Sequence, residues 1–542
     1  MSYINRAIEP LLMKKYQSYK SVAVTGARQV GKTRMTKELF PSVRRINLKN
    51  PNLLDAADSD PQGFMESFDR PLFINEVQEC PKLLSSVKDI LDNVSSYSNY
   101  LFSGSQKWSL MEGLSDSLSG MVGIVELAGL SLREINSIDF NERFIPTDAY
   151  IKNREKELKK YTDIWKKIHR GFYPKLYEHP EKDWEEFYQD YVRTYIERDV
   201  YKITKIRDYQ TFYRFLVSIA ARTGQILDYT NIANDIGISA ETVKLWIGIL
   251  IKTDIVCLLQ PYHNSHLNRA IKSPKIYFRD TGLACFLTSW LTPDTLKNGA
   301  ISGHMFETFV VNEIIKSFIN IGKDYSKYIY YYRGKDKVKK KKTGSNGNVT
   351  EEFEESEIDI IIEEDGILYP VEIKKGSNPT ASDADAFTVL DKDVDKKRGM
   401  GAIICTGEYK LKLRENLYSL PIEYIFNASL GELFVIRTAG NVINEGELAT
   451  VEYAIEHLKV KHIIVLGHTH CGAVHAAIHN EQGRYLYPIL NRIKANIGNI
   501  CDESEASRIN AIKEVSYIKE KFPQYEGTIE YKIYDIETSE SR

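Results

Sequence analysis

Cysteine is scarce in this chain, with six in 542 residues, and none of them falls in the spacing of a disulfide framework. That usage is typical of a reducing compartment, so we expect a cytoplasmic protein. Long apolar runs are missing as well, and no segment approaches the length that spans a bilayer. The sequence therefore predicts no membrane partner.

An excess of one charge is also missing, since 72 basic and 74 acidic side chains leave a formal net charge of −2. Composition thus gives no general reason to expect nucleic-acid binding, which would have to come from a local patch. The length exceeds what one core accommodates. We predict an α/β multi-domain protein with boundaries at residues 1–210, 211–295, 296–426 and 427–542.

Residues 26–33 match the phosphate-binding pattern G-x-x-x-x-G-K-[ST] at each diagnostic position. An apolar run at 21–24 precedes them and a helix-forming run at 34–39 follows, which is the setting that this pattern needs. The glycines let backbone N–H groups turn toward a phosphate at a helix N-terminus. We expect Lys32 to reach the β- and γ-phosphates and Thr33 to bind Mg²⁺. The predicted nucleotide-binding residues are Gly26, Ala27, Arg28, Gln29, Val30, Gly31, Lys32 and Thr33.

A second apolar run, at 72–74, leads into Asn75 and Glu76. In P-loop ATPases such a strand ends in an acidic pair, in which an aspartate binds Mg²⁺ through water and a glutamate orients the attacking water. We therefore predict Glu76, with Lys32, as catalytic and Asn75 as the metal-side residue. A neutral amide accepts a hydrogen bond from metal-bound water but adds no charge, so turnover should be slow.

These two motifs, together with Phe102-Ser103-Gly104-Ser105 and Gly171-Phe172-Tyr173-Pro174, resemble a prokaryotic family of AAA-type ATPases. Its members carry a C-terminal domain of uncharacterised function, and the resemblance covers about residues 1–426. It implies a P-loop AAA-type ATPase fold, ATP and Mg²⁺ as ligands, and it leaves a homo-oligomer open. The family usually has Asp at position 75, where this chain has Asn75.

Residues 226–260 predict a winged helix. Apolar positions at helical spacing cover 229–236, Gly237 and Ile238 make a turn, and Ser239 would cap the second helix. A recognition helix that faces phosphates needs several Lys or Arg, but this one offers Glu241 and Lys244. We rank internal packing or a protein contact above DNA reading.

Farther along, Asp359, Glu372 and Lys374 fall on two adjacent predicted strands joined by an Asp365-Gly366 turn, and Glu307 lies on a preceding helix. This arrangement is similar to the PD-(D/E)XK nuclease-like fold, in which two carboxylates bind Mg²⁺ and the lysine steadies the attacking water. The resemblance implies a nuclease-like site at Glu307, Asp359, Glu372 and Lys374. A fold does not determine an activity, so an active nuclease is only one possibility.

A charge-segregated insertion interrupts that region, with lysines at 337–342 and glutamates at 351–355. A solvated hairpin extension is the default interpretation. A phosphate-contacting arm is the sharper one, and this basic loop and the winged helix are the places where nucleic acid could bind.

The tail changes character after about residue 426. A buried-type strand at 462–466 delivers His468 and Cys471 into a glycine turn. The spacing suits two zinc ligands, which is half of a tetrahedral site.

This segment and the flanking strands resemble a β-class carbonic anhydrase over about residues 424–540, which implies a partial Rossmann-like fold with His468 and Cys471 as zinc ligands. The family supplies a further Cys and an Asp–Arg pair from an upstream C-x-D-x-R segment. Here those places fall on Glu415, Leu417 and Ser419. The tail therefore resembles a truncated carbonic anhydrase that should bind zinc weakly and hydrate CO₂ poorly.

The sequence as a whole predicts an ATP-binding protein, a slow Mg²⁺-dependent ATPase whose nucleotide state controls the winged-helix and nuclease-like domains. Two alternatives stay open. One is a zinc-dependent, impaired carbonic anhydrase activity in the tail, and the other is a nucleic-acid-binding module.

Overall fold

The computed structural model describes residues 3–104, 118–156, 164–195, 200, 208–263, 273–343, 349–392, 395–426, 436, 438–457, 460, 462–481, 483 and 486–534. The chain divides into two compact units, Met1–Ser429 and Leu430–Arg542. Within the described ranges, no helix is both long enough and apolar enough to cross a membrane.

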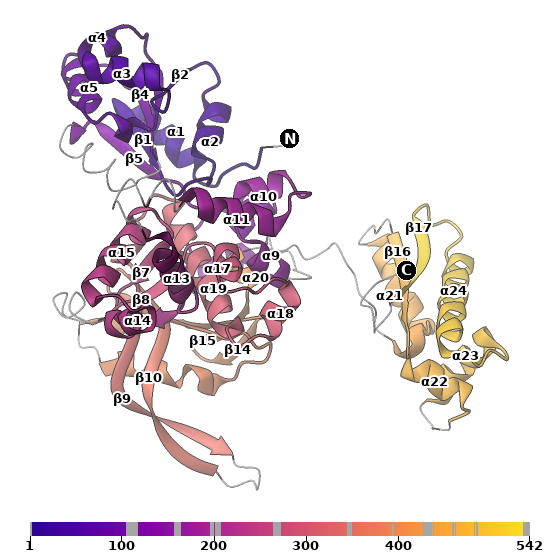
Figure 1. Ribbon diagram of the computed structural model, residues 1–542. Coiled ribbons are helices and arrows are strands. Elements are labelled where there is room, and N and C mark those ends of the chain that lie inside the picture. Colours follow the sequence, from indigo (N-terminus) through magenta and orange to yellow (C-terminus); the bar gives the residue numbers. More distant parts are fainter. Residues whose placement is uncertain are drawn as a thin grey trace. The chain divides into compact units, whose positions relative to one another are not determined.

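The first unit begins with a parallel sheet in the order β2-β3-β4-β1-β5 (Figure 1). Parallel strands need crossover connections, and helices supply them here. The interior strand β1 is buried along its whole length, as expected for a strand covered on both faces. The strands are β1 (Ser21–Thr25), β2 (Arg44–Asn47), β3 (Leu72–Asn75), β4 (Tyr100–Ser103) and β5 (Val122–Glu126). The helices among them are α1 (Glu9–Ser18), α2 (Lys32–Leu39), α3 (Pro51–Ser59), α4 (Pro61–Glu66), η1 (Val77–Glu79) and α5 (Lys82–Asp92).

A helical segment follows the sheet and shares its apolar core. One continuous cluster of buried side chains runs from Ile8 through β1 to Ile425, so the sheet and the rest of the first unit are packed as one body. These helices are α7 (Leu132–Ile135), α8 (Asp148–Glu155), α9 (Ile164–Arg170), α10 (Pro174–Glu178) and α11 (Trp184–Tyr195).

The next segment has helices and a small antiparallel sheet at the place where the sequence predicts a winged helix. Its small sheet runs β6-β8-β7. Gly237 ends the first helix of the pair with φ 79°, a conformation that glycine adopts without strain. The Ser239 side chain accepts a hydrogen bond from the Thr242 backbone N–H at 3.1 Å, so the predicted N-cap is confirmed. The elements are α13 (Tyr209–Ala220), β6 (Gln225–Ile226), α14 (Tyr229–Ile236), α15 (Ala240–Lys252), β7 (Val256–Leu259), β8 (Lys275–Phe278), α17 (Thr281–Leu287) and α18 (Pro293–Asn298).

The last part of the first unit is a mixed sheet in the order β14-β15-β13-β11-β10-β9, with β12 paired to β11. The turn between β10 and β11 has positive φ at both Asp365 (49°) and Gly366 (75°), as the predicted hairpin requires. The elements are α19 (Ser302–Ile319), η3 (Tyr325–Lys327), β9 (Ile329–Thr343), β10 (Val349–Glu364), β11 (Ile367–Ile373), η4 (Ala381–Lys392), β12 (Lys397–Arg398), β13 (Gly401–Cys405), β14 (Leu411–Arg414), β15 (Leu417–Pro421) and α20 (Glu423–Phe426).

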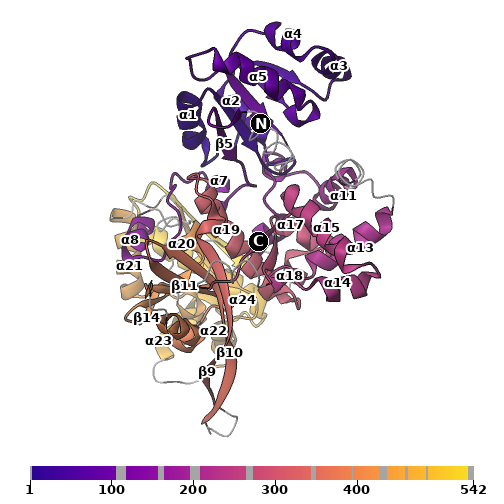
Figure 2. The ribbon, with the colours of Figure 1, turned by 90° about the vertical axis from the view of Figure 1, so that its left-hand side faces the viewer.

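The charge-segregated insertion extends strands β9 and β10 into an antiparallel ribbon that projects from this sheet (Figure 2). Its register pairs Glu351 with Lys341 and Glu352 with Lys340. The acidic stretch of the insertion is thus paired in register with its basic stretch.

The second unit is smaller and contains a parallel pair of strands, β16 (His462–His468) and β17 (Thr528–Tyr534). Helix α24 contacts both strands, and α22 packs against α23 and α24. The remaining elements are η5 (Ala439–Asn441), α21 (Glu445–Glu456), α22 (Gly472–Ile478), α23 (Tyr487–Ile497) and α24 (Glu503–Lys521). The mixed α/β fold class that the sequence predicts is confirmed.

Candidate functional site

The phosphate-binding pattern forms the turn from β1 into α2. Gly26 has φ 138°, and a Cβ there would stand 2.1 Å from the carbonyl oxygen of Leu127, so no side chain fits. Gly31 precedes α2 with φ 98°, again a conformation suited to glycine. The turn therefore needs both glycines of the pattern, and α2 begins directly at Lys32 with its N-terminus facing the loop.

The Lys32 side chain lies back over this loop. Its ammonium donates hydrogen bonds to the carbonyl oxygens of Gly26 (2.8 Å) and Ala27 (2.7 Å). Burial lowers the pKa of Lys32 to about 8, and the nearby Glu76 carboxylate opposes that shift. A cation in this position can exchange its carbonyl partners for phosphate oxygens, which are stronger acceptors.

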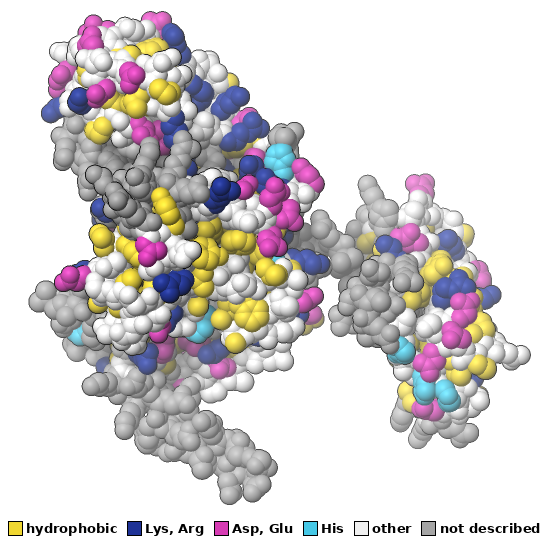
Figure 3. All heavy atoms as spheres, in the orientation of Figure 1, with side chains coloured by type: hydrophobic (Ala, Val, Ile, Leu, Met, Phe, Trp, Pro, Cys, Tyr) yellow, Lys and Arg dark blue, Asp and Glu magenta, His cyan; other side chains and the backbone are white. Residues whose placement is uncertain are grey.

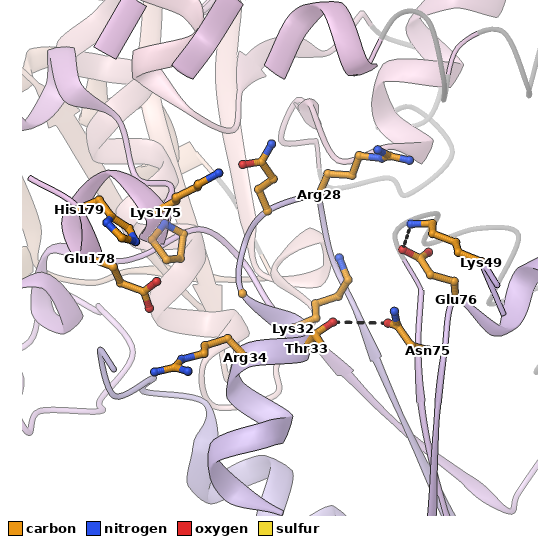
Figure 4. A pocket seen from close by; sticks show the side chains of 13 residues that line it. Arg28, Lys32, Thr33, Arg34, Lys49, Asn75, Glu76, Lys175, Glu178 and His179 are labelled. Atoms are coloured by element: carbon orange, nitrogen blue, oxygen red, sulfur yellow. Dashed lines mark hydrogen bonds and ion pairs between the residues drawn. The ribbon is translucent and has the colours of Figure 1, made fainter. Parts of the chain in front are cut away.

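Asn75 ends β3 beside two hydroxyl groups. Its Oδ1 accepts hydrogen bonds from Ser103 Oγ at 2.5 Å and from Thr33 Oγ1 at 3.4 Å. The parallel register places Asn75 level with Ser103, so adjacent strand ends deliver both groups. The structure thus brings the two predicted metal-side residues, Thr33 and Asn75, within one hydrogen bond of each other (Figure 4).

Glu76 follows in a left-handed backbone conformation, φ 57°. Its carboxylate forms an ion pair with Lys49 and accepts a hydrogen bond from Gln78 Nε2 at 2.6 Å. Burial alone would raise the pKa of Glu76, but the hydrogen bonds and charge of Lys49, with the bond from Gln78, lower it to about 2. The carboxylate is therefore ionised throughout the physiological pH range.

These groups line a cavity of about 480 Å³. Figure 4 shows Lys175, Glu178 and His179 of the α10 region across from the loop. Cations outnumber acids around the cavity, as a polyphosphate would require. The lining residues are Arg28, Gln29, Gly31, Lys32, Thr33, Arg34, Lys49, Asn75, Glu76, Pro174, Lys175, Glu178 and His179.

Sequence reasoning missed Lys49 and the α10 side of this cavity. Lys49 comes two residues after β2, and a polar residue just beyond a parallel strand is the signal that could have found it. Lys175 and His179 carry no such signal, because only tertiary packing places α10 opposite the loop.

Arg6 forms hydrogen bonds with the phosphate loop. It is buried, and its guanidinium donates to the carbonyl oxygens of Val30 (2.8 Å) and Ala128 (2.7 Å) and to the Glu134 carboxylate (3.0 Å). One side chain from the start of the chain thus joins the loop to the segment that follows β5.

The loop also faces the winged helix and helix α19. Its residues Ala27 and Val30 share a small hollow with Asp254, Arg279 and Lys316. Arg279 forms an ion pair with Asp254 at 3.1 Å and lies 3.8 Å from the carboxylate of Glu126 at the end of β5.

Helix α19 makes further polar contacts with the segment beyond β5. Lys316 Nζ donates to the carbonyl oxygen of Leu130 at 2.7 Å, and the Leu132 backbone N–H donates to the Glu313 carboxylate at 3.0 Å. Lys316 and Glu313 also form a buried ion pair at 2.6 Å. Buried charged groups of α19 therefore contact the segment that follows β5 of the parallel sheet.

The predicted nuclease-like residues surround a lysine that sequence reasoning missed. Lys275, at the start of β8, has a side chain that is only 4 % exposed. Its ammonium lies 3.2 Å from Glu307, 2.8 Å from Glu357 and 3.5 Å from Asp359. A cation from the winged helix thus occupies the point where these carboxylates converge. No local pattern marks Lys275, because the carboxylates that surround it are distant in sequence.

Glu372 and Lys374 complete this group and lie at 2.6 Å from each other. Burial, and then the charge of Asp359, raise the pKa of Glu372 to about 8, although Lys374 opposes the shift. Burial and the charge of Glu307 raise the pKa of Asp359 to about 6, and the Ile373 backbone N–H donates to that carboxylate. The second oxygen of Glu372 is buried and has no hydrogen-bond partner among the described residues. A divalent cation bound between Glu307 and Asp359 would compete with Lys275, which forms ion pairs with both carboxylates.

In the second unit, His468 ends β16 and Cys471 caps α22. The Nδ1 atom of His468 is within 2.9 Å of the Thr469 carbonyl oxygen, which leaves Nε2 for a metal. Of the places of the family's other active-site residues, Leu417 and Ser419 lie in β15 of the first unit, and Glu415 lies in the turn between β14 and β15. Cys405 is likewise buried in β13 of that sheet.

Known families match four stretches of the chain. Residues 18–136 match the family described as AAA domain, and residues 420–536 match the one described as carbonic anhydrase. Between them, residues 161–294 and 350–425 match two domains of unknown function, DUF8612 and DUF4143.

Among related proteins, an uncharacterized protein of Mycobacterium tuberculosis is 24% identical over 417 residues, which is 77% of this chain and 83% of that protein. A carbonic anhydrase of Mycolicibacterium smegmatis is 39% identical over 101 residues, 16% of this chain and 48% of that enzyme. The chain thus spans about half the length of that carbonic anhydrase. Among solved structures, the Walker-type ATPase PABY2304 of Pyrococcus abyssi is 11% identical with a TM-score of 0.32, covering 53% of this chain and 96% of that one.

An AAA domain implies ATP and Mg²⁺ as ligands, and the carbonic anhydrase family is typically zinc-dependent. These matches confirm the resemblances to AAA-type ATPases and to the carbonic anhydrase family, and the nuclease-like resemblance stays a prediction. The chain is a fusion of an AAA-type ATPase domain, a DUF4143 domain and a C-terminal domain of the carbonic anhydrase family.

Proposed function

We propose that the chain binds Mg²⁺–ATP in the cavity at the carboxyl ends of β1 and β3 and hydrolyses it slowly. The observation that carries this proposal is the convergence of Lys32, Thr33, Asn75 and Glu76 on one cation-rich cavity. The triphosphate would lie along the loop, and Lys32 would leave its carbonyl partners to bind the β- and γ-phosphates.

The slow rate follows from Asn75. With Mg²⁺ bound, Thr33 Oγ1 would ligate the ion and Asn75 Oδ1 would accept a hydrogen bond from one of its waters. An amide supplies no negative charge to the ion, in contrast to the aspartate of other P-loop ATPases. Weaker binding of Mg²⁺ leaves the developing charge on the γ-phosphate less stabilised.

Glu76 would orient the attacking water. A carboxylate with a pKa near 2 is a poor proton acceptor at neutral pH, so its contribution is positional and electrostatic. Lys49 competes for the same carboxylate. Hydrolysis would therefore need the Glu76–Lys49 pair to open or to act together on the water.

We further infer that the nucleotide state reaches the winged-helix and nuclease-like regions through α19. This helix contacts the segment beyond β5 through Glu313 and Lys316, and it carries Glu307 in the carboxylate group. Glu313 lies six positions after Glu307, which corresponds to a rise of about 9 Å along the helix axis. A shift of the phosphate loop would thus act on α19, a single helix that contacts the segment beyond β5 and also carries Glu307 of the carboxylate cluster.

The test uses the purified full-length chain. Mg²⁺-dependent ATP turnover should fall at least about 100-fold in Lys32→Ala, since the charge that binds the phosphates is lost. Lys37→Ala is the matched control, because Lys37 is exposed on the same helix. If Lys32→Ala bound ATP as tightly as the wild type, the site assignment would be wrong.

The inferred coupling needs its own measurement. Amide hydrogen exchange in α19 should slow when Mg²⁺–ATP binds to the wild type, and should not change with ATP in Lys32→Ala. If the exchange rates in α19 are the same with and without bound nucleotide, the coupling is contradicted, but the proposal that the chain binds ATP is not.

A second candidate, carbonic anhydrase activity of the C-terminal unit, is favoured by the family match over residues 420–536. Two predicted zinc ligands, His468 and Cys471, lie at the end of one strand and the start of the next helix. Without the further cysteine and the Asp–Arg pair, we propose that zinc binding and CO₂ hydration at this place are impaired.

Nucleic-acid binding ranks below both. The exposed positions of α15 include Glu241, Lys244 and Leu245, a mixed surface with little attraction for phosphates. Binding that weakens steeply with rising salt concentration would support this candidate, and binding insensitive to salt would contradict it.

A further inference from the structure

The C-terminal unit gathers three side chains with metal-binding atoms at a place that does not include His468 or Cys471. The ligand atoms of His475, His479 and Glu503 all lie within 4.8 Å of one another. Figure 3 shows histidine side chains beside acidic ones on the surface of this unit.

Two helices supply these groups. His475 and His479 are one turn apart at the end of α22, and their rings stack at 4.1 Å between centroids. Glu503 is the first residue of α24, and its Oε1 lies 2.5 Å from His475 Nδ1. Histidines at i and i+4 on one helix face, with a carboxylate from a neighbouring element, are a frequent zinc-binding arrangement.

The ring of His479 is already oriented for ligation. Its Nδ1 lies 2.9 Å from the carbonyl oxygen of His475, which can only accept a hydrogen bond, so Nδ1 carries the proton. The lone pair is then on Nε2. Metal-binding histidines commonly donate their second ring nitrogen to a carbonyl or carboxylate in this way.

We propose that His475, His479 and Glu503 bind one Zn²⁺ ion. Two imidazoles and a carboxylate are ligands that zinc accepts in tetrahedral sites, with a water in the fourth position. The ion would replace the proton shared by His475 and Glu503, and that proton would be released to solvent. His470, whose Nδ1 lies 4.0 Å from Glu503 Oε2, stands next to the site and can orient the carboxylate.

Such an ion would join α22 to the start of α24. These two helices are in contact, and α22 begins directly after Cys471. Zinc bound here stabilises the unit by linkage to folding, and does not require the third ligand missing at His468 and Cys471.

The experiment uses the full-length chain without a polyhistidine tag. Zinc bound after equilibrium dialysis is measured for the wild type, His479→Ala and Glu503→Gln. Cys471→Ser removes a ligand of the other predicted site, and His457→Ala is the matched control, since His457 is an exposed histidine of the same unit. We expect one zinc per chain in the wild type and in the control His457→Ala, and a dissociation constant at least about tenfold higher in His479→Ala and Glu503→Gln. Cys471→Ser separates the two sites, because it should leave the ion bound by His475, His479 and Glu503 in place.

Cobalt distinguishes the two zinc sites by spectroscopy. Co²⁺ bound to His475, His479 and Glu503 gives ligand-field bands without a thiolate-to-metal charge-transfer band, whereas Co²⁺ on Cys471 gives that band. Zinc binding unchanged in His479→Ala, or lost in Cys471→Ser, would overturn the proposal. So would a thiolate band that accounts for the whole cobalt signal.

Discussion

The phosphate loop and the His468–Cys471 turn are built alike, but they bring together different shares of their predicted site residues. Each joins the end of a parallel strand to the start of a helix. The loop supplies its backbone donors, Lys32 and Thr33 from one continuous segment, and the neighbouring strand adds Asn75 and Glu76. The turn carries the two residues that the sequence predicts as zinc ligands, and a tetrahedral site needs further ligands.

This difference shows how far each predicted site depends on local sequence. A phosphate site depends mainly on a single local turn, so it is retained whenever that turn and its sheet fold. A zinc site draws ligands from separate segments, and the loss of one segment leaves it incomplete. Here the residues at the missing places, such as Leu417 and Ser419, are buried in the sheet of the first unit instead.

The largest expected effect tests whether the phosphate loop depends on contacts with the N-terminal segment. Replacing Arg6 by Ala should lower the free energy of unfolding of the first unit by about 3 kcal/mol, because buried Glu134 would lose its ion-pair partner. Chemical denaturation of the full chain measures this, with exposed Lys14→Ala as the control. An unfolding free energy equal to that of Lys14→Ala would mean that the loop needs no support from the N-terminus.

Next, Asn75→Asp should raise Mg²⁺-dependent ATP turnover by about tenfold, since the carboxylate adds negative charge beside the ion. Initial rates at saturating ATP measure the change. Asn52→Asp, which places the same new charge on exposed α3, should leave the rate unaltered. Turnover that falls in Asn75→Asp would show that the amide is required by this site.

The next prediction concerns the cluster of carboxylates around Glu372, whose residues come from separate elements of the first unit. The pKa of Glu372 is 4.5 in the unfolded chain and about 8 in the folded one. Between these pH values the native state therefore binds more protons than the unfolded state. The free energy of unfolding should fall as the pH rises from about 4.5 to about 8. Glu372→Gln should remove this dependence and be more stable than the wild type at pH ~9 by on the order of 1 kcal/mol.

The measurement is denaturation of the full chain at several pH values. Asp365→Asn is the control, because it removes one charge from the exposed hairpin turn between the same strands. Identical pH dependence in Glu372→Gln and the wild type would contradict the proposed cause.

The smallest expected effect concerns the incomplete site. Cys471→Ser should leave the rate of CO₂ hydration by the chain unchanged within error, because the places predicted for the further Cys and the Asp–Arg pair hold Glu415, Leu417 and Ser419. Stopped-flow hydration assays with added zinc provide the check. A rate that drops in Cys471→Ser would break the comparison, since it would require a working zinc centre at this turn.

Much of the first site could be predicted because its signals are local. Glycines at 26 and 31, followed by Lys32 and Thr33, specify a turn whose backbone geometry few other residues allow. The N-cap at Ser239 and the hairpin turn at Asp365 and Gly366 were predictable for the same reason. The roles of these site residues and the four domain boundaries stay predictions.

What the sequence by itself determined is thus the set of local conformations: the phosphate turn, the caps, the hairpin and the alternation of strands and helices. Only the tertiary structure decided which charges meet. It placed Lys275 among Glu307, Glu357 and Asp359, and it brought His475 and His479 to Glu503. The physical reason is that backbone conformation depends on neighbouring residues, whereas Coulomb and ligand contacts depend on distances in space that packing alone sets.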